Sequence, residues 1–397
     1  MIRHELYKIF SQKIVYIAFS LLIGLQVFQF FNQLPDIKQI QVTRQAFQQY
    51  GGLVTDEKLN WAIENKELYG NNSELAQQIE DETDPIAKQQ LREQFVNIRA
   101  PFEVAIDILK LDENIQHRKE SVIRIEQKLA ANEPPPAYDQ QAIFLTKERN
   151  ALLHMASYPS HAFYKDGWRN ILNYFEEAGH LLIGAMIIIS VAGLYSREYN
   201  VKMDALLLSS RYGRSRAPIA KIIAVIMFSC IVVITFFGIE FLCNAFIYGL
   251  DGIDKPLVNV TSFFSSTLFP YSIGYYIVVR TILVCIGTSS LALFVLFISA
   301  HSRTPLVPAF AGGFVFLLPF AVIFMESFVP YSLVTIVFIA FRFFEFLQFE
   351  SFADYSYVNI FGYAVEYTSL TVTQAIVYIL LTSILIIVTM RKRQVKE

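Results

Sequence analysis

The sequence predicts an all-α integral membrane protein with six transmembrane helices, both termini in the cytoplasm, and a large helical extracytoplasmic domain between the first and second spans. Three observations predict this fold class. Hydrophobic residues make up 54% of the 397 residues and aromatic residues 15%, which is more than an ordinary soluble domain carries. The apolar residues gather in long runs, and Lys and Arg are concentrated in the segments on one side of these runs.

Six apolar runs supply the expected spans. A bilayer core about 30 Å thick requires about 20 apolar residues in a helix, and the shorter runs reach this length with modest extensions. The first run is too long for a secretory signal peptide and lacks a small-x-small cleavage site after it, so we expect a retained anchor. The runs cover residues 14–31, 181–195, 222–247, 273–300, 306–325 and 374–390.

The charges between the runs predict the orientation. Segments 1–13, 196–221, 301–304 and 391–397 together hold 14 basic and 4 acidic residues. The opposite bias appears in residues 34–177, with 16 basic and 23 acidic residues, and in residues 326–372, with one Arg and five acids. Because basic loops stay in the cytoplasm, both termini are expected inside.

The chain then divides into three parts. Residues 1–33 are expected to form a cytoplasmic elbow and the first span, residues 34–175 the extracytoplasmic domain, and residues 176–397 a five-helix membrane domain. Within the second part, Asp84 and Pro85 have the residue types of an N-cap and a first helical position. An apolar face follows, and the proline-rich segment 132–139 indicates a turn between antiparallel helices; the face is formed by Ile115, Val122, Ile125 and Leu129.

The extracytoplasmic domain contains none of the three cysteines, which are Cys230, Cys243 and Cys285, so we expect it to fold without disulfides. The favoured interpretation is a bundle that caps the membrane domain. The alternative is a module that gates substrate or docks a partner.

Motifs for catalysis are missing from the sequence. It has no G-x-x-x-x-G-K-[ST] phosphate loop and no G-x-S-x-G elbow, and its six histidines are scattered along the chain. We therefore expect a chain that is not an enzyme, with no catalytic residue, no metal site and no cofactor of its own, and that does not bind nucleic acid.

The segment 196–221 carries six Lys or Arg and two acids between two apolar runs. Topology explains the charge, because basic residues hold a loop inside. Topology does not explain the apolar segment "MDALLL" within the loop, which we expect to be exposed to the cytoplasm. An apolar patch rimmed by charge is typical of a docking surface for a soluble partner.

These features resemble the permease subunits of ATP-binding-cassette transporters of the type-2, exporter-like class. "MIRHELYKIFSQK" is similar to the family's N-terminal elbow, Glu198 to a Glu after the second span, Met203–Ser210 to its coupling helix, and "APIAK" to the entry into the third span. Residues 271–303 look like the fourth span, and residues 331–372 resemble a re-entrant segment. The resemblance covers residues 1–33 and 176–397, and the large insert departs from many members.

The resemblance implies a dimer with a second permease copy or a paralogue, surrounded by lipids of a bacterial plasma membrane. A separate ATPase subunit would bind ATP and Mg and grip the coupling helix, and substrate would move outward. The residues that we expect to contact the ATPase are Glu198, Met203, Asp204, Leu206, Leu207, Arg211 and Arg214.

Two charged residues fall inside apolar runs, Glu240 in the third and Arg280 in the fourth, both toward the outer end. An unpaired charge at that depth is costly. Three interpretations stay open: an ion pair that braces two helices, side chains that reach the outer headgroups, or part of a substrate pathway.

Three functional classes can be compared with these features of the sequence. A transporter permease explains the elbow, the loop and the spans. A membrane sensor with an extracytoplasmic helical bundle is the alternative, but it would call for a cytoplasmic effector domain, and the longest inside segment is only the loop 196–221. A membrane enzyme lacks a convergent set of nucleophile, base or metal ligands.

Overall fold

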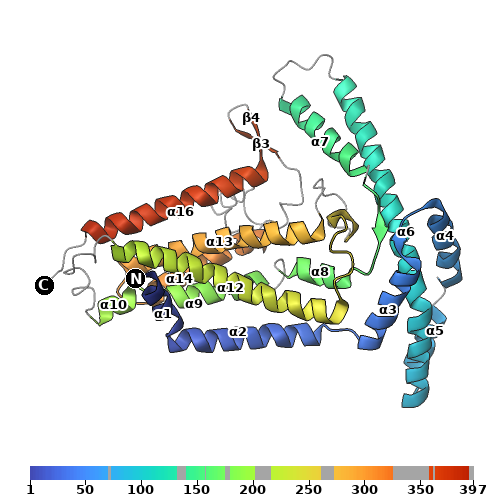
Figure 1. The fold of residues 1–397 in the computed structure, drawn as a ribbon, viewed down its shortest axis with the longest axis horizontal. Coiled ribbons are helices and arrows are strands. Elements are labelled where there is room, and N and C mark those ends of the chain that lie inside the picture. The colour runs from blue at the N-terminus through green and yellow to red at the C-terminus, as the bar shows by residue number, and fades with distance from the viewer. Residues whose placement is uncertain are drawn as a thin grey trace.

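The computed structural model describes residues 1–69, 73–131, 140–156, 158–174, 179–201, 216–260, 272–324, 357–360 and 363–392. A bundle of long apolar helices lies beside an inserted helical domain (Figure 1). The two described ends of the chain lie at the end of the bundle far from the inserted domain, which we call the terminal end. The bundle contains α1 (Ile2–Phe10), α2 (Lys13–Asn32), α9 (Gly179–Val191), α10 (Ser196–Asn200), α12 (Arg216–Tyr248), α13 (Ile273–His301), α14 (Leu306–Phe324) and α16 (Tyr367–Lys392).

Five described helices are long and apolar enough to cross a membrane, which makes this a multi-pass membrane protein. They cover Lys13–Asn32, Gly179–Asn200, Arg216–Tyr248, Ile273–His301 and Ser369–Lys392. The remaining predicted run, residues 306–325, forms the 19-residue helix α14 (Leu306–Phe324). Its described apolar stretch, Leu306–Leu318, is shorter than the five others, so six spans and the sidedness stay predictions.

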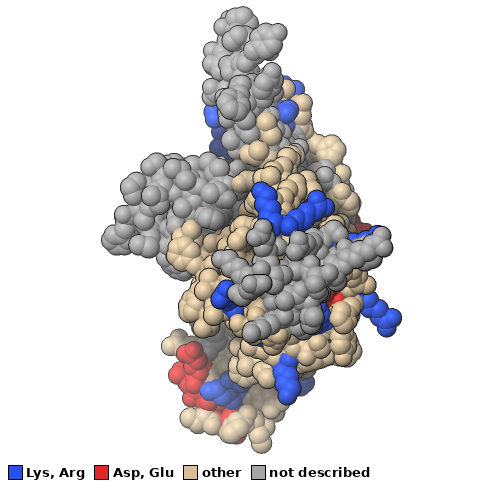
Figure 2. Space-filling view, turned by 90° about the vertical axis from the view of Figure 1, so that its left-hand side faces the viewer, with Lys and Arg blue, Asp and Glu red and all other residues tan. Residues whose placement is uncertain are grey.

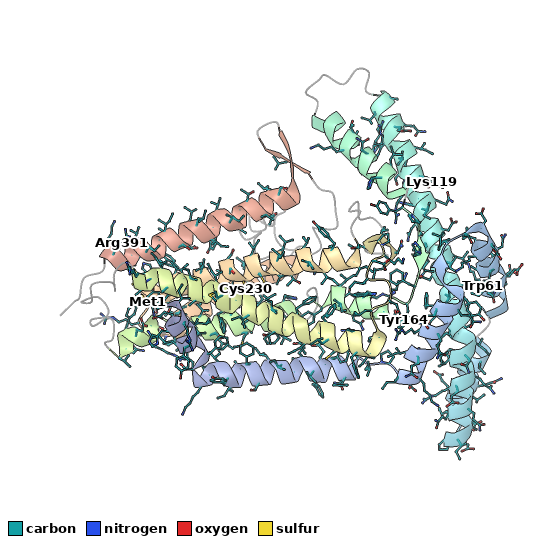
Figure 3. The ribbon with its side chains drawn as sticks, in the orientation of Figure 1. Met1, Trp61, Lys119, Tyr164, Cys230 and Arg391 are labelled. Carbon is teal, nitrogen blue, oxygen red and sulfur yellow. The ribbon has the colours of Figure 1, made fainter. Side chains whose placement is uncertain are left out.

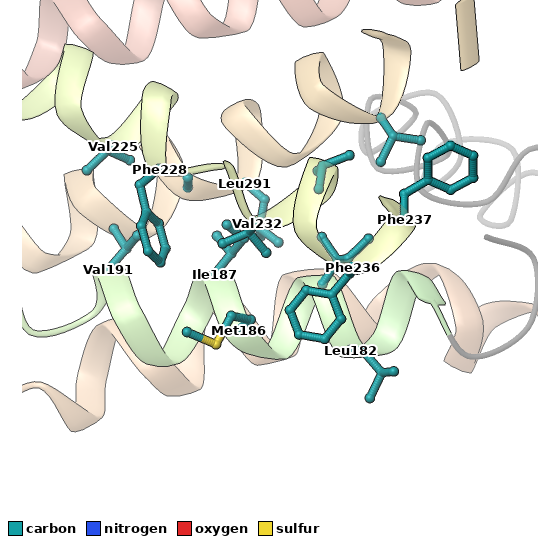
Figure 4. Close-up of a cluster of buried hydrophobic side chains, with 14 of the residues drawn as sticks. Leu182, Met186, Ile187, Val191, Val225, Phe228, Val232, Phe236, Phe237 and Leu291 are labelled. Atoms are coloured by element: carbon teal, nitrogen blue, oxygen red, sulfur yellow. The ribbon is translucent and has the colours of Figure 1, made fainter. Parts of the chain in front are cut away.

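The core of the bundle is centred on α12 and α13, which pack against each other and against α9. Phe228, Val232 and Phe236 of α12 meet Met186 and Ile187 of α9 in a continuous buried cluster (Figure 4). Both helices carry apolar side chains on nearly every face, so the sequence does not mark an inward face. Packing alone selects which face lies inside. By contrast, α2 and α16 keep most of their apolar surface exposed, as expected for helices in contact with lipid or another chain.

The inserted domain (residues 34–175) is helical around one long helix. That helix, α6, begins at Pro85, and Asp84 Oδ1 accepts a hydrogen bond of 3.1 Å from the Ile86 amide, as its N-cap position predicts. Val122 and Ile125 of α6 pack against Leu145 and Leu152 of α7, and Leu129 packs against this cluster. Three of the four residues of the predicted apolar face are thus confirmed, and Ile115 does not belong to the cluster. The helices of this domain are α3 (Ile37–Tyr50), α4 (Asp56–Tyr69), α5 (Ser73–Asp81), α6 (Pro85–Ala131), α7 (Gln140–Ala156) and α8 (Asp166–Asn173).

Short strands and polar contacts join the inserted domain to the bundle. β1 (Gly52–Leu53) pairs antiparallel with β2 (His161–Ala162), which leads the chain into α8 against α12. Tyr164 lies at this junction, 6.3 Å from the ring of Tyr248 at the end of α12 (Figure 3). The guanidinium of Arg44 in α3 is 2.7 Å from Asp251, just beyond α12.

Part of the segment 331–372, expected to be re-entrant or interfacial, is described. It forms a hairpin of β3 (Tyr357–Ile360) and β4 (Tyr363–Glu366), followed by the first turns of α16. β4 contacts both α16 and α7, so the hairpin lies at the end of the bundle that carries the inserted domain. The remainder of the segment, and the proline-rich turn at 132–139, lie outside the described residues.

Candidate coupling site

Four charged side chains meet near the terminal end of the bundle. Lys221, in the first turns of α12, is 2% exposed. Its Nζ lies 2.5 Å from Glu198 Oε1 of α10 and 3.2 Å from Glu5 Oε2 of α1. Lys8 of α1 closes the set, with its Nζ 3.0 Å from Glu5 Oε1 and 3.1 Å from Glu198 Oε1. We call these four residues the charge cluster.

The charge cluster is balanced, with two acids and two lysines. Burial favours the neutral form of Glu5, but the neighbouring charges of Lys221 and Lys8 and their hydrogen bonds outweigh it and hold the pKa of Glu5 below its ordinary value. Burial likewise disfavours charged Lys8, yet Glu198 and Glu5 raise the pKa of Lys8. The Lys221 ammonium also lies 4.8 Å from the centre of the Tyr195 ring, a cation–π contact.

Hydrogen bonds attach the segment around α10 to α13. Ser299 Oγ of α13 donates to the Ala192 carbonyl at 2.8 Å, and it accepts from the amides of Tyr195 and Ser196 at 3.2 and 3.3 Å. Tyr199 donates its hydroxyl to the Ala300 carbonyl at 2.9 Å. The chain that follows the second apolar run is therefore fixed to the end of α13 as well as to α1 and α12.

Of the residues expected to contact an ATPase, the structure describes Glu198 and places it in the charge cluster. The others lie outside the described residues: Met203, Asp204, Leu206, Leu207, Arg211 and Arg214. Both borders of this stretch are described, because α10 ends at Asn200 and α12 begins at Arg216. Glu198 and Lys221 thus join the two arms of the loop at its base.

The described surface at the terminal end is basic. Figure 2 views this end, and Lys and Arg side chains are spread over it. Among the described residues of the four segments expected inside, Glu5 and Glu198 are the acids, and both are buried. The exposed basic side chains there are Arg3, Lys13, Arg197, Arg216, Arg303, Arg391 and Lys392.

Glu240 and Arg280 are both buried, and they form hydrogen bonds with different partners. Glu240 accepts hydrogen bonds from Gln26 Nε2 of α2 at 3.3 Å and from Asn244 Nδ2 at 2.8 Å. Arg280 Nη1 donates to the Leu172 carbonyl, at the end of α8, at 3.2 Å. The ion pairs between described residues do not include one that joins them.

Sequence reasoning did not identify the charge cluster as a site, nor Gln26 as a partner of Glu240. The sequence contains only weak signals for the charge cluster and for Gln26. Glu5 is the acid of a basic N-terminal segment, with Lys8 one helical turn further on, and Gln26 interrupts an apolar run. None of these positions indicates its distant partner, because the contacts span up to 214 residues.

Metal ligands do not gather in the part of the chain that the structure describes, where no group of three His, Cys, Asp or Glu side chains is arranged to hold an ion. Comparison of the chain with protein-family models, with curated proteins and with solved structures found no match in any of the three.

Proposed function

We propose that this chain is the permease subunit of an ATP-binding-cassette transporter, with six spans, both termini in the cytoplasm of a bacterium, and a second permease copy or paralogue beside it. A separate ATPase subunit supplies the energy of ATP hydrolysis, with its own ATP and Mg, for export of substrate across the plasma membrane. The proposal starts from the resemblance of the elbow, the loop 196–221 and the order of the apolar runs.

The observation that supports it best is the charge cluster at the base of the loop 196–221. Through Glu198 and Lys221 the two arms of this loop are joined to each other, and through Glu5 and Lys8 they are joined to the elbow helix α1. A soluble partner that pushes on the loop would therefore move α1, α10 and α12 together. Ser299 would carry the same displacement to α13.

A loop that served topology alone would need its positive charges but not this buried framework. Charged groups buried together cost desolvation, so the framework is better explained by a need to fix the geometry than by stability. The basic surface of the terminal end also suits a partner that approaches from the cytoplasm, because surface charge steers docking.

The test captures the ATPase with the full-length chain. A tagged chain is purified from its native membranes in a mild detergent, the co-purifying proteins are identified by mass spectrometry, and ATP hydrolysis by the complex is measured. We expect an ATPase with a phosphate-binding loop. Changing Leu206 and Leu207 to Ser should weaken its binding at least a hundredfold, since burial of each leucine contributes about 1.5–3 kcal/mol.

A matched control changes Leu53 and Leu153 to Ser, because both are exposed leucines of the inserted domain, 46% and 44% accessible. This control should bind the ATPase like the unaltered chain. Normal ATPase binding by the Leu206→Ser, Leu207→Ser chain would contradict the coupling role. Recovery of a signalling effector in place of any ATPase would favour the sensor alternative.

A further inference from the structure

A cavity of about 380 Å³ lies within the inserted domain, between α3, α6 and the segment that leads from β2 into α8. Tyr164, at the junction with the bundle, is part of its wall (Figure 3). The described lining comes from residues 35–169, so none of it belongs to the five apolar helices. Pockets that hold small molecules have volumes of about 300–1,000 Å³. The cavity is therefore large enough for a small soluble molecule.

Three acids line this cavity, and each of them forms an ion pair with a base of the same lining. The pairs are Arg99 Nε to Glu103 Oε1 at 2.7 Å, Arg169 Nη1 to Asp166 Oδ1 at 3.1 Å, and Lys165 to Asp107. These six residues therefore contribute no net charge to the lining.

Lys110 supplies the remaining charge of the described lining. Lys110 is exposed, and the ion pairs between described residues do not include it. Asp107, three residues earlier in α6, is already paired with Lys165, and the side chains of that pair are only 8% and 13% exposed. The described lining thus carries one more positive than negative charge, which an anion would offset.

Apolar side chains form another part of the lining. Ile40 and Phe47 of α3 are buried, whereas Phe102 and Ile106 of α6 are partly exposed. Phe102, Ile106 and Lys110 follow one another at intervals of four residues, so they share one face of α6. An anion bound by Lys110 would have apolar neighbours on this face, and an apolar body on the ligand would remove them from water.

We propose that this cavity binds a small organic monoanion, a carboxylate with an apolar body, with Lys110 as its counter-ion and Phe102 and Ile106 against the apolar part. One excess positive charge matches a carboxylate. It does not match a dianion such as free phosphate, which would leave a negative charge in the lining. The proposal goes beyond the transport function and does not depend on it, because it concerns binding to the inserted domain alone.

The test measures the Tm of the purified full-length chain in phosphatidylcholine nanodiscs, because a ligand that binds the folded state raises the Tm with its concentration. The probes are 3-phenylpropionate and its uncharged amide, 3-phenylpropanamide. The variants are Lys110→Gln, which removes the counter-ion, and Ile106→Trp, which fills the cavity from α6. The matched control is Lys119→Gln, which removes an exposed lysine of the same helix that does not line the cavity.

We expect 3-phenylpropionate to raise the Tm of the unaltered chain and of Lys119→Gln. Its binding should be about threefold weaker in Lys110→Gln, where one exposed ion pair is lost, and about tenfold weaker in Ile106→Trp, where the ligand's space is occupied. The amide should bind the unaltered chain about threefold more weakly than the carboxylate. The proposal is overturned if 3-phenylpropionate leaves the Tm of the unaltered chain unchanged, or if the amide binds as tightly. It is also overturned if either cavity variant, folded as judged by its Tm without ligand, responds like the control.

Discussion

Lys221 Nζ lies 2.5 Å from Glu198 Oε1, although the two residues are 23 positions apart in the sequence and lie on opposite sides of the loop between α10 and α12. The pair fixes the base of that loop, and it belongs to a cluster that also includes Glu5 and Lys8 of the elbow. The elbow helix and the described base of the loop are therefore joined at the terminal end of the bundle.

Replacing Lys221 by Met should destabilise the protein by about 3–5 kcal/mol, because the buried Glu198 loses its nearest cation and the buried Glu5 loses one of its two. The double variant Lys221→Met, Glu198→Gln should be less destabilised than Lys221→Met alone. The comparison is made by thermal unfolding in detergent. Lys38→Met breaks the exposed ion pair with Glu93 and should leave the Tm unchanged. Equal losses in the single and double variants would contradict the buried pairing.

Glu5 should make stability depend on pH. Its pKa in the folded chain lies below the ordinary value of 4.5, so the unfolded chain binds its proton more readily. The stability that Glu5 contributes is present above pH 4.5 and is lost as the pH falls through the lowered pKa. The Tm of the unaltered chain should exceed that of Glu5→Gln at pH 7, and this difference should shrink below pH 4.5. A difference that stays constant down to acid pH would refute the linkage.

Glu240 and Arg280 should act independently on stability, because Glu240 bonds to Gln26 of α2 and Arg280 bonds to the end of α8. The effects of Glu240→Gln and Arg280→Met should add to within about 0.5 kcal/mol in a double-mutant cycle. Gln26→Leu and Glu240→Gln should not be additive, since these two residues share a hydrogen bond. A large interaction energy between Glu240 and Arg280 in the cycle would contradict this prediction and would support an ion pair between α12 and α13.

The number of spans can be decided by labelling. Single cysteines at Arg3, Lys119 and Arg391, all exposed, are introduced after the three native cysteines are replaced. With six spans, a membrane-impermeant thiol reagent added to intact cells should label position 119 and neither of the other two. If α14 does not cross the membrane, five spans remain, and position 391 becomes accessible together with position 119.

The sequence by itself determined the features that depend on local composition and spacing. The apolar runs became α2, α9, α12, α13, α14 and α16, because a run of this length has few alternatives to a helix that satisfies its own backbone. Asp84 and Pro85 marked the start of α6 for an equally local reason, since a cap acts within one turn.

Only the tertiary structure decided which polar side chains meet. A helix that is apolar all round carries no signal for its rotation, so the sequence could not reveal that Glu240 contacts Gln26 of α2. The charge cluster assembles from α1, α10 and α12, which are distant in the sequence and brought together by the packing of Ile9 and Val15 within the bundle core. Contacts of this kind depend on the summed burial of many apolar side chains, and no single segment contains that information.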